Sequence, residues 1–171
     1  MITSFKTAEY VSPKHPDKIC NRIADAILDA HLLSDSLARV AIEVVGGHGQ
    51  VVVMGEVTSS ARVDTQPIVA RIAGDGLKVT ENIITQSPGI ARGVDTGGAG
   101  DQGIMIGYAS NETPELLPLE YVLARDLNRQ LYDKYDSNGK TQITIKGHKL
   151  PQIVASFQHT KQTELLQVIL A

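Results

Sequence analysis

Apolar residues recur every three or four positions in several stretches of the chain, a spacing that predicts amphipathic helices. One helix is predicted to begin near Pro16, because proline suits a first helical turn, where its missing N–H would go unused. A shorter helix is predicted around Ile68 and Ile72, and a longer one over 116–135. A last helix is predicted to begin near Thr160.

Runs of β-branched residues that flank glycine-containing turns predict antiparallel hairpins. One such turn lies at Gly46–Gly49 and a second at Lys146–His148. A further strand is predicted over Leu77–Thr85, and a short apolar strand over the IMIGYA stretch, 104–109. Between them, the glycine-rich stretch 87–103 has little periodicity and is predicted to be a loop.

The order helix, hairpin, helix occurs twice, from Pro16 to Ala73 and again from Pro118 onward. We therefore predict an α+β fold of two pseudo-repeated units, each an antiparallel sheet with helices on one face. The domains are predicted at 1–100 and 101–171, with their boundary in the loop 87–103. The other face of each sheet must then be covered by something else.

The composition excludes several classes of protein. A net charge of −3 argues against a general nucleic-acid binder, which would show a basic patch. The single cysteine, Cys20, excludes an intrachain disulfide and is expected to be a buried structural thiol. No stretch reaches the ~18 apolar residues of a membrane span, and the N-terminus lacks the apolar run of a signal peptide. We expect a cytoplasmic protein with neither a nucleic-acid nor a membrane partner.

Three polar side chains stand together at the start of the first predicted helix. Helix N-termini suit phosphates, and Lys18 would add a full positive charge. Asp17 could hold Mg²⁺ through one carboxylate plus phosphate oxygens, and His15 could donate to a leaving oxygen. The alternative is an ordinary helix start with a solvated lysine, and spacing alone favours that alternative.

Further candidates lie in the loop and the hairpins. Asp101, within GGAGDQG, could neutralise a cationic group, or the stretch could be a flexible connector. Glu43 and Glu56 stand in apolar runs, where a carboxylate needs a cation, a partner or exposure at a sheet edge. Lys140 follows the turn DSNG, where a lysine is ordinarily solvated.

The ordered series HPDKI, GEVTSSA, SPGIARGVD, GAGDQGIMIGYASNET, GKTQITI and SFQH resembles the S-adenosylmethionine synthetases. The resemblance covers essentially the whole chain, but only about the first half of a usual family member. It implies attack of the methionine sulfur on C5′ of ATP and cleavage of the displaced triphosphate to pyrophosphate and phosphate. It also implies Mg²⁺, K⁺, related α/β domains, and active sites between subunits whose flat sheet faces pair.

On the phosphate side, the resemblance implies that His15 assists the departing 5′ oxygen and that Asp17 binds Mg²⁺. Lys18 and Lys140 would contact phosphates, and Glu9 corresponds to an active-site glutamate.

On the methionine side, the resemblance implies that Glu56 and Asp101 hold methionine, Asp101 through the ammonium group. Arg92 stands where the family usually has a glutamine that touches methionine, and Glu43 would serve the K⁺ site. Catalysis is expected to depend on His15, Lys18 and Asp101.

Departures from the family pattern surround these residues. Lys14 replaces a usual glycine, Asn21 replaces a usual acid, and Thr96–Gly97 is a much shortened lid segment. A trimmed lid should exclude water less completely.

The family's glycine-rich GGGAFS-type phosphate motif and its later lysines, arginine and metal-binding aspartates are absent from these 171 residues. The resemblance therefore implies a homo- or hetero-oligomer in which a second chain carries the C-terminal half, and the apolar TELLQVILA suits docking with it. Two alternatives stay open, namely a non-catalytic regulatory or structural subunit and a piece of a full-length enzyme.

Overall fold

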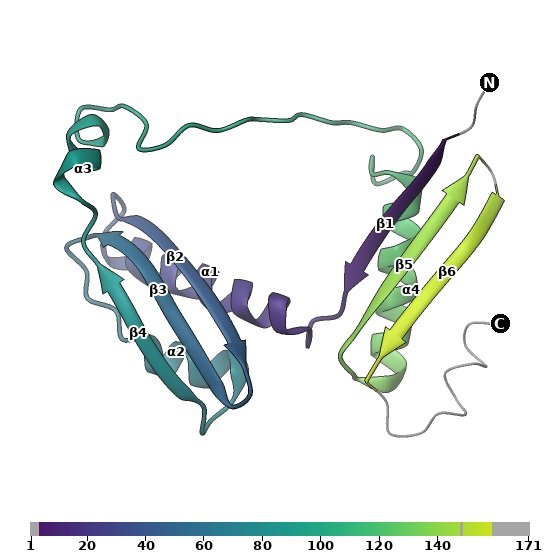
Figure 1. Ribbon diagram of the computed structural model, residues 1–171, viewed down its shortest axis with the longest axis horizontal. Coiled ribbons are helices and arrows are strands. Elements are labelled where there is room, and N and C mark those ends of the chain that lie inside the picture. Colours follow the sequence, from purple (N-terminus) through teal and green to yellow (C-terminus); the bar gives the residue numbers. More distant parts are fainter. Residues whose placement is uncertain (1–3, 148, 159–171) are drawn as a thin grey trace. The chain divides into compact units, whose positions relative to one another are not determined.

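The computed structural model describes residues 4–147 and 149–158. The chain divides into two compact units, which we call the continuous unit, Ile19–Ile106, and the split unit, Met1–Lys18 with Gly107–Ala171. Each unit contains a three-stranded sheet with helical structure packed against it (Figure 1), which confirms the predicted α+β class. The domain boundary within 87–103 and the pseudo-repeat stay predictions.

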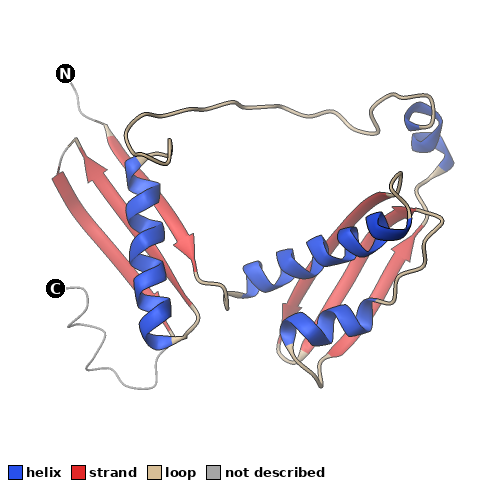
Figure 2. Ribbon diagram, turned by 180° about the vertical axis from the view of Figure 1, so that it is seen from behind, coloured by secondary structure: helices blue, strands red, loops and turns tan. Residues whose placement is uncertain are grey.

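The continuous unit is built on a sheet of β2 (Arg39–Gly47), β3 (Gln50–Thr58) and β4 (Lys78–Ile84), in that order. The helices α1 (Pro16–Ser34) and α2 (Thr65–Ala73) lie on one face of this sheet (Figure 2). The β2–β3 hairpin is antiparallel as predicted, but β3 and β4 are parallel. An all-antiparallel sheet was therefore wrong here, because α2 is a crossover that returns the chain to its original direction.

The core of the continuous unit is aliphatic. Ile23 and Ile27 of α1 are fully buried, against Val51 and Val53 of the central strand and Val69 of α2. In β3 the buried valines alternate with side chains on the opposite face, as the pleat requires. The amphipathic patterns predicted for α1 and α2 therefore face this core.

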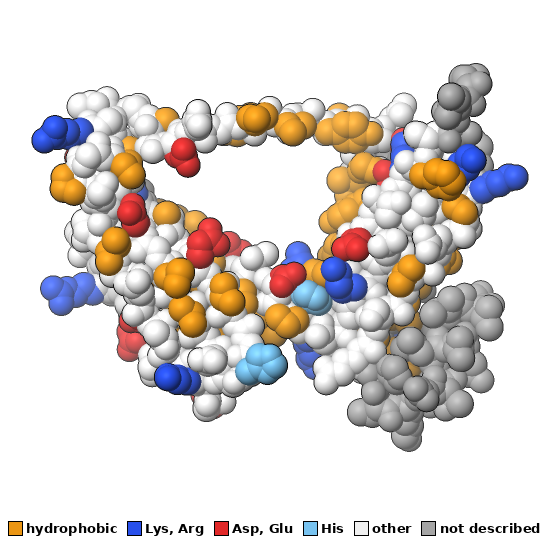
Figure 3. Space-filling model, viewed as in Figure 1, with side chains coloured by type: hydrophobic (Ala, Val, Ile, Leu, Met, Phe, Trp, Pro, Cys, Tyr) orange, Lys and Arg blue, Asp and Glu red, His pale blue; other side chains and the backbone are white. Residues whose placement is uncertain are grey.

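The opposite face of the same sheet, which we call the outer face, carries large apolar side chains among carboxylates (Figure 3). Val45, Met54 and Ile84 are exposed on it. By register, Glu43 lies opposite Met54, and Glu56 lies opposite Ala41 on one side and Ile84 on the other. An exposed apolar surface of this kind is typical of an interaction site.

The Asp35 carboxylate joins the end of α1 to the end of β3. Oδ2 accepts hydrogen bonds from the Ser60 N–H at 2.8 Å, the Ser59 hydroxyl at 2.9 Å and the Ser60 hydroxyl at 3.1 Å. Oδ1 accepts one from the Leu37 N–H at 3.1 Å. These donors, with Ser60 N–H first, lower the pKa of Asp35 from 3.8 to about 2. The serines of GEVTSSA thus serve the fold.

Asp35→Asn is expected to lower the melting temperature of the protein at neutral pH, since a neutral amide is a weaker acceptor for this set of donors. Because the pKa is depressed in the folded state, this stabilisation is present above the ordinary carboxyl range. It is lost as the pH falls from about 4 to about 2. Thermal unfolding of wild type and variant across that range checks the result. A gap in melting temperature that stays constant down to the lowest pH would contradict it.

The split unit contains an antiparallel sheet of β1 (Phe5–Val11), β5 (Gly139–Lys146) and β6 (Lys149–Phe157), in that order. The helix α4 (Leu119–Tyr135) packs on one face through the buried Ala124, which contacts Ile143 and Ile145 of β5. The second hairpin and α4 were predicted, but β1 was not. Because β1 pairs with β5, the described residues up to Lys18 lie with the described residues from Gly107 onward.

Two predictions about the connecting stretch were wrong. Within the supposed loop 87–103, Pro88–Val94 forms a short helix, α3. The supposed strand 104–109 has no strand pairing among the described residues, and Ile104, Met105 and Ile106 are almost fully exposed. Cys20 is only half-buried, contrary to expectation. The helix predicted near Thr160 lies outside the described residues. No helix in the described part of the chain is long and apolar enough to cross a membrane.

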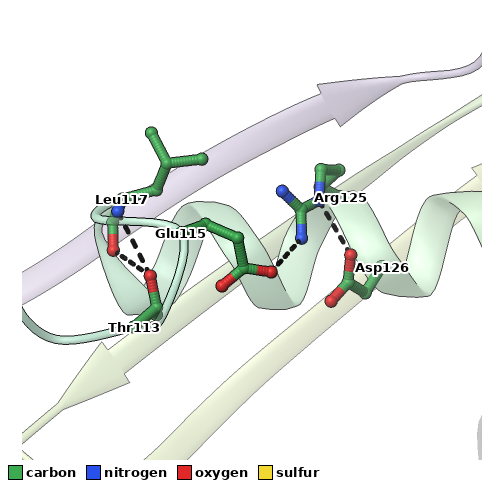
Figure 4. Close-up of polar contacts among 5 residues, drawn as sticks. All are labelled: Thr113, Glu115, Leu117, Arg125 and Asp126. Atoms are coloured by element: carbon green, nitrogen blue, oxygen red, sulfur yellow. Dashed lines mark hydrogen bonds and ion pairs between the residues drawn. The ribbon is translucent and has the colours of Figure 1, made fainter.

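The turn that leads into α4 is closed by its own side chains (Figure 4). The Thr113 hydroxyl donates to the Leu117 carbonyl at 2.8 Å and accepts from the Leu117 N–H at 3.2 Å. The Arg125 guanidinium of α4 binds Glu115 at 3.0 Å and Asp126 at 2.8 Å. The Thr113 contacts close the turn, and the Glu115–Arg125 ion pair ties it to α4.

Glu112, in the NET portion of the same segment, joins three parts of the split unit. One carboxylate oxygen pairs with Lys6 of β1 at 2.6 Å, and the other accepts from the Leu119 N–H at 3.1 Å. The hydrogen bond from Lys6 is the largest cause of a lowered Glu112 pKa. This part of the sequence signature therefore has a structural role, as a cap for α4 and a tie to β1.

Candidate functional site

The phosphate-side candidates gather in the split unit. Glu9 of β1 and Lys140 of β5 lie on the same sheet face, and their carboxylate and ammonium groups are 3.1 Å apart. Both side chains are about half exposed, at 53% and 45%. Lys140 therefore already has an anionic partner, which an incoming phosphate would have to displace or share.

The loop between β1 and α1 is fixed to the start of β5. The fully buried Ser12 donates its N–H to the Gly139 carbonyl at 2.8 Å, and its hydroxyl accepts from the Gly139 N–H at 2.9 Å. Next to it, the Lys14 ammonium contacts the Asp136 carboxylate at 2.5 Å. This hydrogen bond lowers the pKa of Asp136. Lys14, a departure from the family pattern, thus holds the His15 loop beside the strand that carries Lys140.

The His15 ring is hydrogen-bonded through Nδ1. Its Nδ1 accepts a hydrogen bond from the Asp17 N–H at 3.2 Å, so the neutral ring carries its proton on Nε2. The His15 N–H in turn donates to the Ser12 carbonyl at 3.0 Å. The Asp17 carboxylate lies 3.5 Å from Nδ1 and is largely exposed, so it remains accessible to a cation. The ring therefore presents Nε2–H as a hydrogen-bond donor.

Lys18 is held over an aromatic ring that the sequence reasoning missed. Its ammonium lies 5.9 Å from the centroid of Tyr10, within reach of a cation–π interaction. The Tyr10 ring packs edge-on against Tyr121, with centroids 5.8 Å apart. The buried Asn128 amide donates to the Tyr10 carbonyl at 3.2 Å. Strand β1 thus contacts two cations of the candidate site, Lys140 through Glu9 and Lys18 through Tyr10.

The methionine-side candidates belong to the continuous unit. Glu43 and Glu56 both lie on the outer face, Glu43 exposed and Glu56 half-buried. Glu56 lines a pocket of about 160 Å³ with Arg39, Val40, Ala41 and Gln86. A carboxylate beside apolar atoms in a small pocket suits a cationic group attached to a short apolar chain.

Arg92 and Asp101 lie farther along the chain of this unit. Arg92 is exposed on α3, and Asp101 is exposed in the glycine-rich segment, where its carboxylate accepts from the Gln102 N–H at 2.7 Å. A Cβ on Gly98 would lie 2.6 Å from the Gly93 carbonyl, and one on Gly100 would lie 3.0 Å from Val94. These glycines therefore permit close approach to α3, where the sequence had indicated approach to a ligand.

Comparison with protein families assigns both parts of the sequence. Residues 3–88 match the model of the S-adenosylmethionine synthetase N-terminal domain, and residues 96–170 match that of the central domain. The chain belongs to the S-adenosylmethionine synthetase family.

Relatives named S-adenosylmethionine synthase extend this match. The Fusobacterium nucleatum subsp. nucleatum protein is 43% identical, over 94% of this chain and 48% of its own length. The Nocardia farcinica protein is 40% identical, over 93% of this chain and 50% of its own length. The Synechococcus sp. WH7803 protein is 40% identical, over 91% and 46%. The chain spans about half the length of the curated relatives it matches.

The residues of this S-adenosylmethionine synthetase family member fit metal ions only in part. Among the described residues, no three His, Cys, Asp or Glu side chains gather as a complete metal site. Mg²⁺ usually binds through one or two carboxylates plus phosphate oxygens, and the exposed Asp17 carboxylate suits that role. Glu43 offers one exposed carboxylate among apolar neighbours, so a K⁺ ion there would need further oxygens from elsewhere.

Proposed function

We propose that this chain forms one side of the active site of a methionine adenosyltransferase, which makes S-adenosylmethionine from ATP and L-methionine. The observation that carries the proposal is the His15 loop. It is hydrogen-bonded to β5 beside Lys140 and presents His15, Asp17 and Lys18 at the N-terminus of α1. Family membership supports the same reading.

The reaction needs groups that stabilise a leaving triphosphate. The methionine sulfur forms a bond to C5′ while the bond from C5′ to the 5′ oxygen breaks, and the electron pair stays on that oxygen. The sulfur carries no proton, so positioning matters more than a base. His15 would donate from Nε2 to the departing oxygen, and Lys18 and Lys140 would bind the phosphates. Mg²⁺, held by Asp17, would supply further positive charge when bound.

The methionine side would come from Glu56, Arg92 and Asp101, with Asp101 facing the ammonium group. The pocket beside Glu56 supports this assignment, because its small volume and mixed lining suit an amino acid with a short apolar side chain. The tripolyphosphate would then be hydrolysed to pyrophosphate and phosphate, with Glu9 beside Lys140.

The rest of the site would come from polypeptide outside these residues. We propose an oligomer in which the apolar outer face of the continuous unit pairs with another subunit and Glu43 contributes to a K⁺ site. A second chain that carries the glycine-rich phosphate motif would complete the phosphate site. Exposed apolar residues among carboxylates on this face support such pairing.

The proposal is tested by reconstitution. The purified chain is combined with a polypeptide that carries the C-terminal half, then supplied with ATP, L-methionine, Mg²⁺ and K⁺. We expect S-adenosylmethionine, pyrophosphate and phosphate in equal amounts, with the Fusobacterium relative as positive control. Product that forms equally well with Asp101→Asn would identify a non-catalytic subunit. No product from an assembled complex would refute the proposal.

Glu9→Gln is expected to tighten the binding of inorganic tripolyphosphate by about 1.4- to five-fold, because exposed ion pairs contribute roughly 0.2–1 kcal/mol and the variant frees Lys140. Isothermal titration of the chain with tripolyphosphate measures the change. Glu81→Gln, in the continuous unit, is the control and should leave the affinity unchanged. Weaker binding by Glu9→Gln would show that Glu9 helps to hold the phosphates and is more than a counterion.

A further inference from the structure

Helix α3 is too short to be stable without contacts to other parts of the unit. It has 7 residues, none of them buried. Isolated helices shorter than about 12–15 residues are marginal in water, so most of the stability of such a helix must come from contacts outside it. Its apolar side chains supply little, since Ile90 is exposed and only Ala91 and Val94 are half-buried.

The side chain of Arg39 contacts residues on both sides of α3. Arg39, the first residue of β2, donates from Nε to the Gln86 side-chain oxygen at 3.3 Å, just before α3. Its Nη2 lies 3.0 Å from the carboxylate of Asp95, the C-cap of α3. The rigid guanidinium can make both contacts at once, and the β2–β3 hairpin fixes its backbone, with Arg39 opposite Thr58.

The position of α3 in turn sets that of the glycine-rich segment. The Gly98 N–H donates to the Gly93 carbonyl at 2.9 Å, and the Gly97 N–H donates to Val94 at 3.0 Å. Gly100 lies against Val94 and Ile90, close to the Gln86 side chain. Asp101 follows directly, so its backbone is anchored through α3 to Arg39.

Arg39 also lines the pocket that contains Glu56. Arg39 therefore belongs to the lining of this pocket and also contacts, through Gln86 and Asp95, the segment that carries the other methionine-side candidates. We propose that Arg39 is a positioning residue, whose guanidinium holds segment 86–101 so that Arg92 and Asp101 have a fixed placement relative to Glu56. The inference rests on the proposed function for its consequence on methionine, but the structural tie stands without it.

The first measurement is hydrogen exchange on the intact chain. Arg39→Met is expected to speed the exchange of the Ala91, Asp95, Gly97 and Gly98 amides at least about five-fold, because it removes hydrogen bonds to a charged group. Exchange in the α1 core should not change. Arg71→Met, an exposed arginine on α2, is the matched control. Wild-type exchange at these amides in Arg39→Met would overturn the inference, whatever the activity of the protein.

The second measurement uses the reconstituted enzyme. Arg39→Met is expected to raise the KM for methionine roughly ten-fold while the KM for ATP stays within about two-fold, since only the methionine side is loosened. Arg39→Lys should give a KM for methionine between those of wild type and Arg39→Met. The charge-swapped double variant, Arg39→Asp with Asp95→Arg, should reverse part of the increase in this KM. Equal changes in both KM values would mean a merely structural role and would overturn the inference. A wild-type complex with no turnover would refute the proposed function and leave hydrogen exchange to decide on Arg39.

Discussion

Gly55→Ala is expected to unfold the continuous unit, or to lower its free energy of unfolding by about 3 kcal/mol or more. Gly55 lies within β3, the central strand of the sheet, with φ of +146°. A Cβ there would lie 2.0 Å from the Ala41 carbonyl oxygen and 3.0 Å from the Ile42 Cα. These are backbone atoms of the paired strand, so relief requires the hairpin itself to separate.

The matched control is Gly47→Ala, in the same hairpin. No atom lies within 4 Å of a Cβ built at Gly47, which is exposed. Urea unfolding followed by circular dichroism compares the variants with wild type, and Gly47→Ala should stay within about 0.5 kcal/mol, as for most surface substitutions. Equal stability of the two variants would mean that the β2–β3 ladder can shift to admit a side chain.

His15→Ala is expected to reduce turnover of the reconstituted enzyme by about 10²–10⁴-fold, the usual contribution of a positioned proton donor. The reason is geometric, since the Asp17 N–H occupies Nδ1 and leaves Nε2–H as the donor. The loss should appear mainly in kcat, because the proposed hydrogen bond from His15 to the leaving oxygen would strengthen as charge develops on that oxygen.

Two amide variants, His15→Gln and His15→Asn, distinguish the effect of where the hydrogen-bond donor lies from the effect of losing the imidazole ring. His15→Gln places an N–H near the position of Nε2 and should retain part of the activity, whereas His15→Asn reaches only the position of Nδ1 and should behave like His15→Ala. Steady-state rates with ATP and methionine provide the measurement. Equal activities of the glutamine and asparagine variants would contradict the assignment of Nε2 as the donor.

Much of the fold could be predicted because its signals are local. The helix after Pro16 and the hairpin around Gly46–Gly49 follow from periodicity and turn chemistry, and both are present. Strand β1 gave a weak signal, because Lys6, Thr7 and Glu9 make FKTAEYV too polar for an isolated apolar strand. Its pairing with β5 depends on a partner far along the chain, which local spacing does not reveal.

The short helix α3 and the stretch 104–109 show the converse error. Glycines within 87–103 predict a loop, yet the contacts of Arg39 with Gln86 and Asp95 accompany one helical stretch there. IMIGYA has strand-forming residues, but propensity needs a paired neighbour to become a strand.

The sequence predicted which side chains belong to the candidate site but not how they are arranged. Motif order pointed to His15, Asp17 and Lys18, but nothing in their spacing shows which nitrogen of His15 is free. The supporting residues Ser12, Tyr10 and Arg39 carry no motif of their own. Ser12 acts through a buried hydroxyl, Tyr10 through a ring face and Arg39 through a guanidinium. These contacts form only when segments far apart in the sequence pack together.

The pairing of β1 with β5 has a consequence for the order of events during synthesis. The ribosome makes β1 first, yet its hydrogen-bonding partner emerges only after the whole continuous unit has been translated. The continuous unit can therefore fold as an insertion while β1 is still unpaired. Closure of the sheet between β1 and β5 is then the late, entropically costly step. Since Ser12 and Gly139 join at that closure, the geometry around His15 would form only when this sheet closes. That geometry would therefore be absent until β5 has been translated.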